Sequence, residues 1–281
     1  MESTGSLNEY HVYTLWAVWL LIFVRMVGFF VQAPIWGSHH VNKPVLVGSA
    51  ASIAVVIFPT VPATNEMVEL GKNMAEGDYA PLIFLIAAQI TVGLVIGYVS
   101  YLIMAAMQFG AEILDVQMGL SVAASFDPAS HGAVNMIRRW AFYLAMILYL
   151  MMNGHHKALE AMRYSFDVIP LSGVPFSHRM LEDLMMKTGL IFSIGLQLAS
   201  PIVASLFITQ VALGMVARVA PQMNVFMLSF PLNIAIGLTL LGASLMPWRI
   251  KLAQLFEENN HWMWQNIRHM IPHAPGFSGF W

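Results

Sequence analysis

Residues 188–248 read TGLIFSIGLQLASPIVASLFITQVALGMVARVAPQMNVFMLSFPLNIAIGLTLLGASLMPW and contain one charged side chain, that of Arg218. This run is about two bilayer crossings long, because a helical crossing needs about 20 apolar residues. The polar break RVAPQMN divides it, with Pro221 placed to stop a first helix and Asn224 placed before a second. The pattern predicts a hairpin of membrane-type helices. Arg218 must face water, a partner protein or a pore, because lipid excludes a charged side chain.

The composition of the whole chain agrees with this reading. Of the 281 residues, 58% are apolar and 10% are charged, whereas an average soluble domain has about 25% charged residues. The formal net charge of -2 provides no basic surface for nucleic acid. The absence of cysteine excludes disulfides and thiolate metal sites. The start lacks a positively charged region of the signal-peptide kind, so we expect no cleavable signal.

Six apolar stretches predict an all-α, polytopic membrane-class fold built from helical hairpins. They cover residues 12–36, 45–62, 81–109, 136–152, 188–217 and 225–248. Pro201 and Pro231 should kink or break the last two, and broken helices in apolar surroundings need neighbouring protein to bond the freed carbonyls. We therefore expect helices packed in an assembly. Residues 1–248 should form one helical domain, and residues 249–281 an amphipathic tail.

Arg25 lies inside the first apolar stretch, in LLIFVRMVGFF. A central arginine costs about 2.5–3.5 kcal/mol to insert, while each Leu, Ile, Phe or Val around it returns about 0.3–0.6 kcal/mol. Insertion therefore remains possible. Either the side chain snorkels or bonds a neighbouring carbonyl, or it forms a salt bridge to another subunit.

Glu112 and Asp115 stand three residues apart, on one helical face if the third helix continues past Gly110. Such carboxylates can form an acid pair, a cation site or a proton relay, or they can mark a helix end that emerges into water. The surrounding segment AEILDVQMGLSVAASFDPASHG is rich in small residues. It suits a displaceable loop better than a rigid active site.

Enzyme signatures are missing from the sequence. GxxxxGK[ST], HExxH and GxSxG do not occur, so P-loop nucleotide binding, zincin chemistry and a nucleophile elbow are not indicated. The histidine pairs at 39–40 and 155–156 lack ligand spacing. We expect no catalytic residue, cofactor or metal.

Two segments resemble the FliR family of flagellar type III export-gate proteins. ALGMVARVAPQMNVFMLSFPL (212–232) is similar to that family's hairpin, and AEILDVQMGLSVAASFDPASHG (111–132) resembles its central loop. Arg25 followed by Ala33-Pro34, and the Asn153-Gly154-His155 run, fall where the family has similar residues. The resemblance covers about residues 10–248, and the combination of motifs is specific.

The resemblance implies a non-enzymatic subunit of the gate that passes unfolded flagellar proteins across the bacterial inner membrane at the basal body. Its implied partners are FliP and FliQ within a pore-enclosing complex, FlhB at the cytoplasmic mouth and FlhA below. Broken helices would then be covered by sister subunits.

Site residues follow from the same resemblance. The family's channel plug matches residues 110–126, with apolar contacts from Met118, Leu120 and Phe126 holding it shut. The implied plug residues are Gly110, Glu112, Asp115, Gln117, Met118, Gly119, Leu120 and Phe126. The implied inter-subunit and hairpin-break residues are Arg25, Arg218, Pro221, Gln222, Asn224 and Pro231.

The chain also departs from the family pattern. Ala111 and Asp115 stand where glycine is common, and Ser229 replaces a frequent glycine. The first departure stiffens the root of the plug and adds a carboxylate.

Two other functions remain open from the sequence. An ion-coupled secondary transporter would use Glu112, Asp115 and Arg218, since broken helices with charges are typical of that class. The equivalent subunit of a virulence-type injectisome is related, although the QMGLS and APQMN motifs favour the flagellar branch. An intramembrane hydrolase has no motif in its favour.

Overall fold

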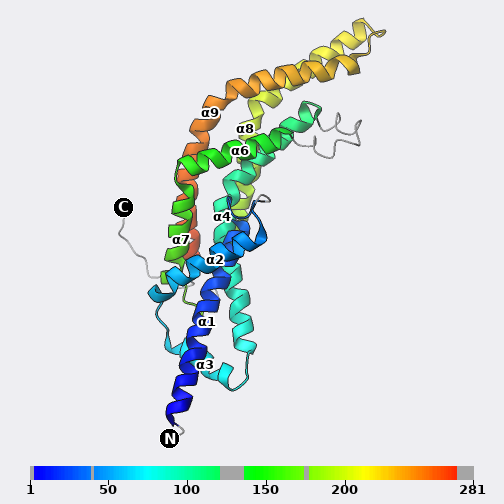
Figure 1. Cartoon of the computed structure of the whole chain (residues 1–281). Helices are drawn as coiled ribbons and strands as arrows, with labels where there is room; N and C mark the ends of the chain where they lie inside the picture. Colours follow the sequence, from blue (N-terminus) through cyan, green and yellow to red (C-terminus); the bar gives the residue numbers. More distant parts are fainter. Residues whose placement is uncertain (1–2, 39–40, 121–135, 174–176, 271–281) are drawn as a thin grey trace. The chain divides into compact units, whose positions relative to one another are not determined.

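The computed structural model describes residues 3–38, 41–120, 136–173 and 177–270, and every regular element in these ranges is helical (Figure 1). The all-α prediction is confirmed. The helices are α1 (Ser3–Gln32), α2 (Lys43–Ile57), the short 3-10 turn η1 (Phe58–Thr60), α3 (Asn65–Ala75), α4 (Ala80–Gln117), α6 (Met136–Met151), α7 (Gly154–Val168), α8 (His178–Val219) and α9 (Val225–His269).

Five helical segments in the described part of the chain are long and apolar enough to cross a membrane. They are Tyr10–Gln32, Lys43–Thr60, Ala80–Gln117, His178–Val219 and Met227–His269. The remaining predicted stretch, 136–152, forms α6, whose 16 residues fall short of the roughly 20 that a crossing needs. The chain is therefore a polytopic membrane-class protein, and its apolar helix α6 is shorter than a bilayer crossing.

Three helices are far longer than one bilayer crossing. Helices α4, α8 and α9 contain 38, 42 and 45 residues, about twice the ~20 residues that span the hydrocarbon layer. Lipid can cover only part of each. The remainder must meet water or other protein.

The chain divides into two compact units. The first contains α1, α2, α3, α4 up to Tyr101, α7, α8 up to Met185 and α9 from Asn259. Within it α1 packs against α2 and α3. It also crosses α4 closely, because a Cβ on Gly93 would collide with the carbonyl of Arg25. Glycine is required there by the approach of the two backbones.

The second unit contains the rest of α4, then α6, and the main parts of α8 and α9. Helices α8 and α9 form the predicted hairpin (Figure 1). Helix α4 crosses α8 at two facing glycines: a Cβ on Gly110 would stand 2.6 Å from the Gly195 carbonyl oxygen. One on Gly195 would stand 2.7 Å from the Ala106 carbonyl oxygen.

The turn between α8 and α9 follows the predicted break. Helix α8 ends at Val219, and α9 begins at Val225 after Asn224, whose side-chain oxygen accepts the Met227 backbone N–H at 3.3 Å. Asn224 therefore caps the second helix, as asparagine does at many helix starts.

A kink or a break was expected at Pro201 and Pro231, and the structure shows no break in either helix. Helix α8 continues through Pro201, and α9 continues through Pro231 and Pro247. Each proline removes only one backbone donor, so the flanking hydrogen bonds can still hold the helix together around a bend.

Helix α9 also continues past Trp248 to His269, into the predicted tail. The residues beyond Trp248 keep an apolar face, with Leu252, Phe256 and Ile267 buried. In the first unit the end of α9 meets the start of α8, where His269 Nδ1 lies 3.1 Å from Asp183 Oδ2. The tail is thus packed as a helix over its described residues.

Candidate functional site

Arg25 is fully buried inside the first unit and joins three helices. From α1 its Nε donates to Gln89 Oε1 of α4 at 2.7 Å. Its terminal nitrogens donate to the Ser165 and Ile169 carbonyl oxygens, each at 3.1 Å. The guanidinium also lies over the Phe166 ring of α7, 4.4 Å from its centroid.

From the sequence, Arg25 could bond a neighbouring carbonyl or form a salt bridge to another subunit. With 0% exposure, the side chain has no surface for a contact with another chain, and it takes the carbonyl-bonding role instead. Gln89 extends the network by donating to the Leu171 carbonyl oxygen at 2.8 Å. A forked guanidinium suits several fixed acceptors, which a lysine could not reach together.

The carboxylates at the end of α4 have different surroundings. Asp115 is 0% exposed; its Oδ1 accepts the Ile137 backbone N–H at 3.1 Å and its Oδ2 accepts that of Arg138 at 3.0 Å. Glu112 is exposed and lies 3.6 Å from the Arg138 guanidinium. Both acids thus contact the start of α6, Asp115 through backbone N–H groups and Glu112 through the Arg138 side chain.

The first part of the predicted plug loop is helical. Residues 110–117 belong to α4, which ends at Gln117, so the expectation of a pliable loop from Gly110 onward is wrong for these residues. Gly110 serves the close crossing with α8. The residues that follow it are mostly good helix formers, and Asp115 has its own buried partners.

Met118 and Gly119 follow α4 and pack on α9. Met118 is 0% exposed, and a Cβ on Gly237 would lie only 2.5 Å from its terminal methyl. Gly119 has φ +80, and a Cβ there would meet the Phe230 ring at 2.7 Å. Both the backbone conformation and the available space thus require glycine at 119.

The other predicted plug residues are less buried or lie outside the described residues. Gln117 and Leu120 are half-buried. Phe126 lies outside the described residues, as do the other positions of the predicted loop from 121 to 132.

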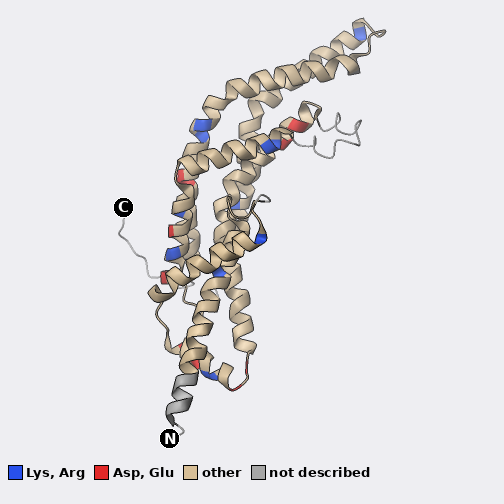
Figure 2. Ribbon diagram, in the orientation of Figure 1, with Lys and Arg blue, Asp and Glu red and all other residues tan. Residues whose placement is uncertain are grey.

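The predicted hairpin break forms the exposed end of the α8–α9 hairpin. Arg218, Pro221, Gln222 and Asn224 are all exposed, and so is Pro231 on α9. Figure 2 shows how few charged positions accompany them along α8 and α9. Arg218 is therefore an accessible cation in the last turn of α8.

Large apolar side chains cover the outside of this hairpin. Phe207 is 61% exposed, Ile208 68% and Met227 72%. In the most apolar window of α9 only 17% of residues are buried, against 56% for α1. A surface this apolar is stable only against lipid or other protein.

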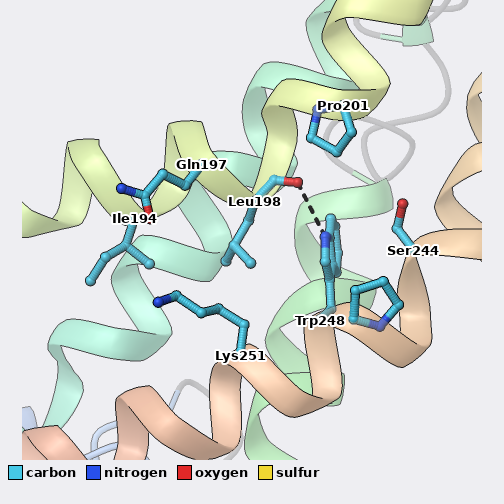
Figure 3. Close-up of a pocket in the computed structure, with 8 residues that line it drawn as sticks. Ile194, Gln197, Leu198, Pro201, Ser244, Trp248 and Lys251 are labelled. Atoms are coloured by element: carbon cyan, nitrogen blue, oxygen red, sulfur yellow. Dashed lines mark hydrogen bonds between the residues drawn. The ribbon is translucent and has the colours of Figure 1, made fainter.

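A cavity of about 290 Å³ lies between α8 and α9 beside Trp248 (Figure 3). The indole N–H donates to the Leu198 carbonyl oxygen at 3.1 Å, close to Pro201. Lys251 is the single titratable side chain among the residues that line this cavity. No acid–base or nucleophilic pair converges there.

Sequence reasoning missed several of these contacts. Gln89 carried a usable signal, since it is a polar side chain inside an apolar run and Arg25 needed an acceptor. Gly195 and Gly237 carried none, because nothing in their neighbourhood distinguishes them from other helical glycines. Among the described residues no group of three potential metal ligands is assembled.

Comparison with known proteins relates this arrangement to protein export. A family described as bacterial export proteins, family 1, matches residues 16–259. The chain is 33% identical over 230 residues to the flagellar biosynthetic protein FliR of Bacillus subtilis (strain 168), covering 81% of this chain and 85% of that protein. It is 33% identical over 236 residues to FliR of Escherichia coli (strain K12), covering 83% and 87%. Surface presentation of antigens protein SpaR of Shigella flexneri is 26% identical over 212 residues, covering 75% and 78%.

Proposed function

This chain belongs to the bacterial export proteins, family 1, and on that premise we propose that it is a structural, channel-forming subunit of the flagellar export gate. Its relatives named FliR cover most of its length, so it is a component of a flagellar or type III export apparatus. In the proposed role it lets unfolded flagellar proteins cross the inner membrane at the basal body. FliP and FliQ surround it, with FlhB and FlhA at the cytoplasmic side.

One observation carries the proposal: the described residues of this chain cover only a small part of the long apolar helices α8 and α9. Helix α8 has 42 residues and α9 has 45, and large apolar side chains remain exposed along both. Lipid can cover only about 20 residues of each helix. Partner helices would cover the rest, which favours a multi-subunit assembly over a solitary transporter.

The plug assignment is the finer part of the proposal. Met118 and Gly119 pack against α9 through Gly237 and Phe230, which anchors the start of the segment that resembles the plug. The transporter alternative gains little from the site, because both oxygens of Asp115 accept backbone N–H groups. Arg218, the third charged residue of that alternative, is exposed beside the turn between α8 and α9.

Deletion of residues 117–126 tests the plug in cells that assemble the complete apparatus. We expect the idle gate to leak small ions and growth to slow, because the barrier in the channel is gone. Copurification of the variant with tagged FliP is the necessary control for assembly. An assembled deletion variant with unchanged ion conductance would refute the plug assignment.

A further inference from the structure

We propose that Asp115 is a positioning residue of the closed export channel, which holds the first turn of α6 against the last turns of α4. The inference rests on the proposed function, since it concerns the two helices that flank the plug segment. It assigns to this carboxylate a structural task in the barrier and no part in proton transfer.

The contacts of this junction belong to described residues that are buried, except for the half-buried Arg138. Asp115 is 0% exposed and Ile137 is 4% exposed. The two carboxylate oxygens accept the second and third backbone N–H groups of α6, those of Ile137 and Arg138, at 3.1 and 3.0 Å. Two bonds from one rigid carboxylate fix both the distance and the orientation of the α6 start.

Helix physics explains why this arrangement should be firm. The first N–H groups of an α-helix have no acceptor within the helix, and a capping side chain at the helix start commonly accepts the second or third. Here a residue of another helix does so across 22 sequence positions. Its negative charge also complements the positive end of the helix dipole, and charge-assisted bonds are the stronger kind.

Burial makes the contact difficult to replace. If the carboxylate is removed, little water can reach the buried Ile137 N–H, and an unsatisfied buried donor is costly. The neighbouring pair of Glu112 and Arg138 cannot take over. Its charged atoms lie 3.6 Å apart with side chains 48% and 42% exposed, and exposed ion pairs contribute little.

Three variants of the full chain, in the assembled gate, test the proposal. Asp115→Ala removes both acceptors without weakening α4, since alanine has the highest helix propensity. Asp115→Asn keeps one acceptor oxygen and serves as the conservative rescue. Asp167→Asn is the matched control, because it neutralises an exposed carboxylate of α7 that pairs only loosely with Arg163, at 3.6 Å.

The first measurement is hydrogen exchange of peptides covering residues 136–140 in the purified gate. We expect Asp115→Ala to speed exchange of the Ile137 and Arg138 amides about 10-fold, the effect of losing a helix cap. Asp115→Asn should lie between this variant and the wild type, and Asp167→Asn should match the wild type. Exchange within twofold of wild type in Asp115→Ala would overturn the proposal.

The second measurement is ion conductance of the idle gate in cells, which a purely local structural effect would not change. We expect a leak in Asp115→Ala and a smaller one in Asp115→Asn. If the 117–126 deletion leaks but Asp115→Ala does not, the positioning role is wrong and the plug assignment stands. If neither leaks, the plug assignment fails and the channel role of Asp115 fails with it. If Asp115→Ala does not assemble, hydrogen exchange and ion conductance are measured on Asp115→Asn instead. Wild-type values of both in Asp115→Asn would refute the positioning role.

Discussion

The side chain of Arg25 connects segments that are far apart in the sequence. Arg25 takes its acceptors from Gln89 and from α7, 64 and 140 or more positions away. Each acceptor is buried, so removal of the guanidinium leaves several polar atoms unsatisfied at about 1–3 kcal/mol each. Arg25 therefore holds α1, α4 and α7 of the first unit together through hydrogen bonds.

Substitution of Arg25 tests that role. We expect Arg25→Ala to destabilise the chain by about 3 kcal/mol or more, because a buried donor to several acceptors is lost. Arg25→Lys should recover only part of this, since an ammonium cannot reproduce the planar fork. Thermal unfolding in detergent is the measurement, with exposed Arg163→Ala as the control. If Arg25→Ala is as stable as this control, Arg25 does not stabilise the helix packing.

Helical elements are positioned by glycines where backbones cross and by caps where helices start. Gly110 and Gly195 let α4 and α8 approach so closely that a Cβ on either would overlap a backbone atom of the partner. Gly214 on α8, by contrast, has no atom within 4 Å of its Cβ position. The same residue type thus has different energetic roles along one helix.

Alanine at these glycines should therefore have opposite effects. Gly195→Ala should destabilise the second unit, because the clash involves the backbone of α4, which cannot swing aside as a side chain could. Gly214→Ala should raise helix stability by about 1 kcal/mol. Thermal unfolding in detergent measures both changes. A neutral Gly195→Ala would contradict the described crossing.

Much of the element order could be predicted from the sequence, and the reasons are local. Apolar runs and the RVAPQMN break identified the α8–α9 hairpin, including the cap at Asn224, because turn and cap signals lie within a few residues. The helical course of residues 110–117 and the continuation of α9 past Trp248 were not predicted. Both depend on packing: Gly110 looks flexible until Gly195 lies against it.

At the scale of the whole molecule, the described residues expose many large apolar side chains. Exposed side chains such as Phe207 and Val219, at 61% and 87%, lie on α8, whose 42 residues are about twice the ~20 that lipid can cover. A soluble protein rarely leaves so much apolar surface open to water. The central claim is that other polypeptides of the export apparatus cover it.

Photocrosslinking at Phe207 tests this claim most directly. A benzophenone amino acid replaces Phe207 in cells that make the complete apparatus, and Phe256, which is 3% exposed, receives the same label as the control for contacts within the chain. We predict that Phe207 forms covalent adducts with other protein chains, and that Phe256 does not. Adducts of Phe207 with lipid, and none with protein, would contradict the account.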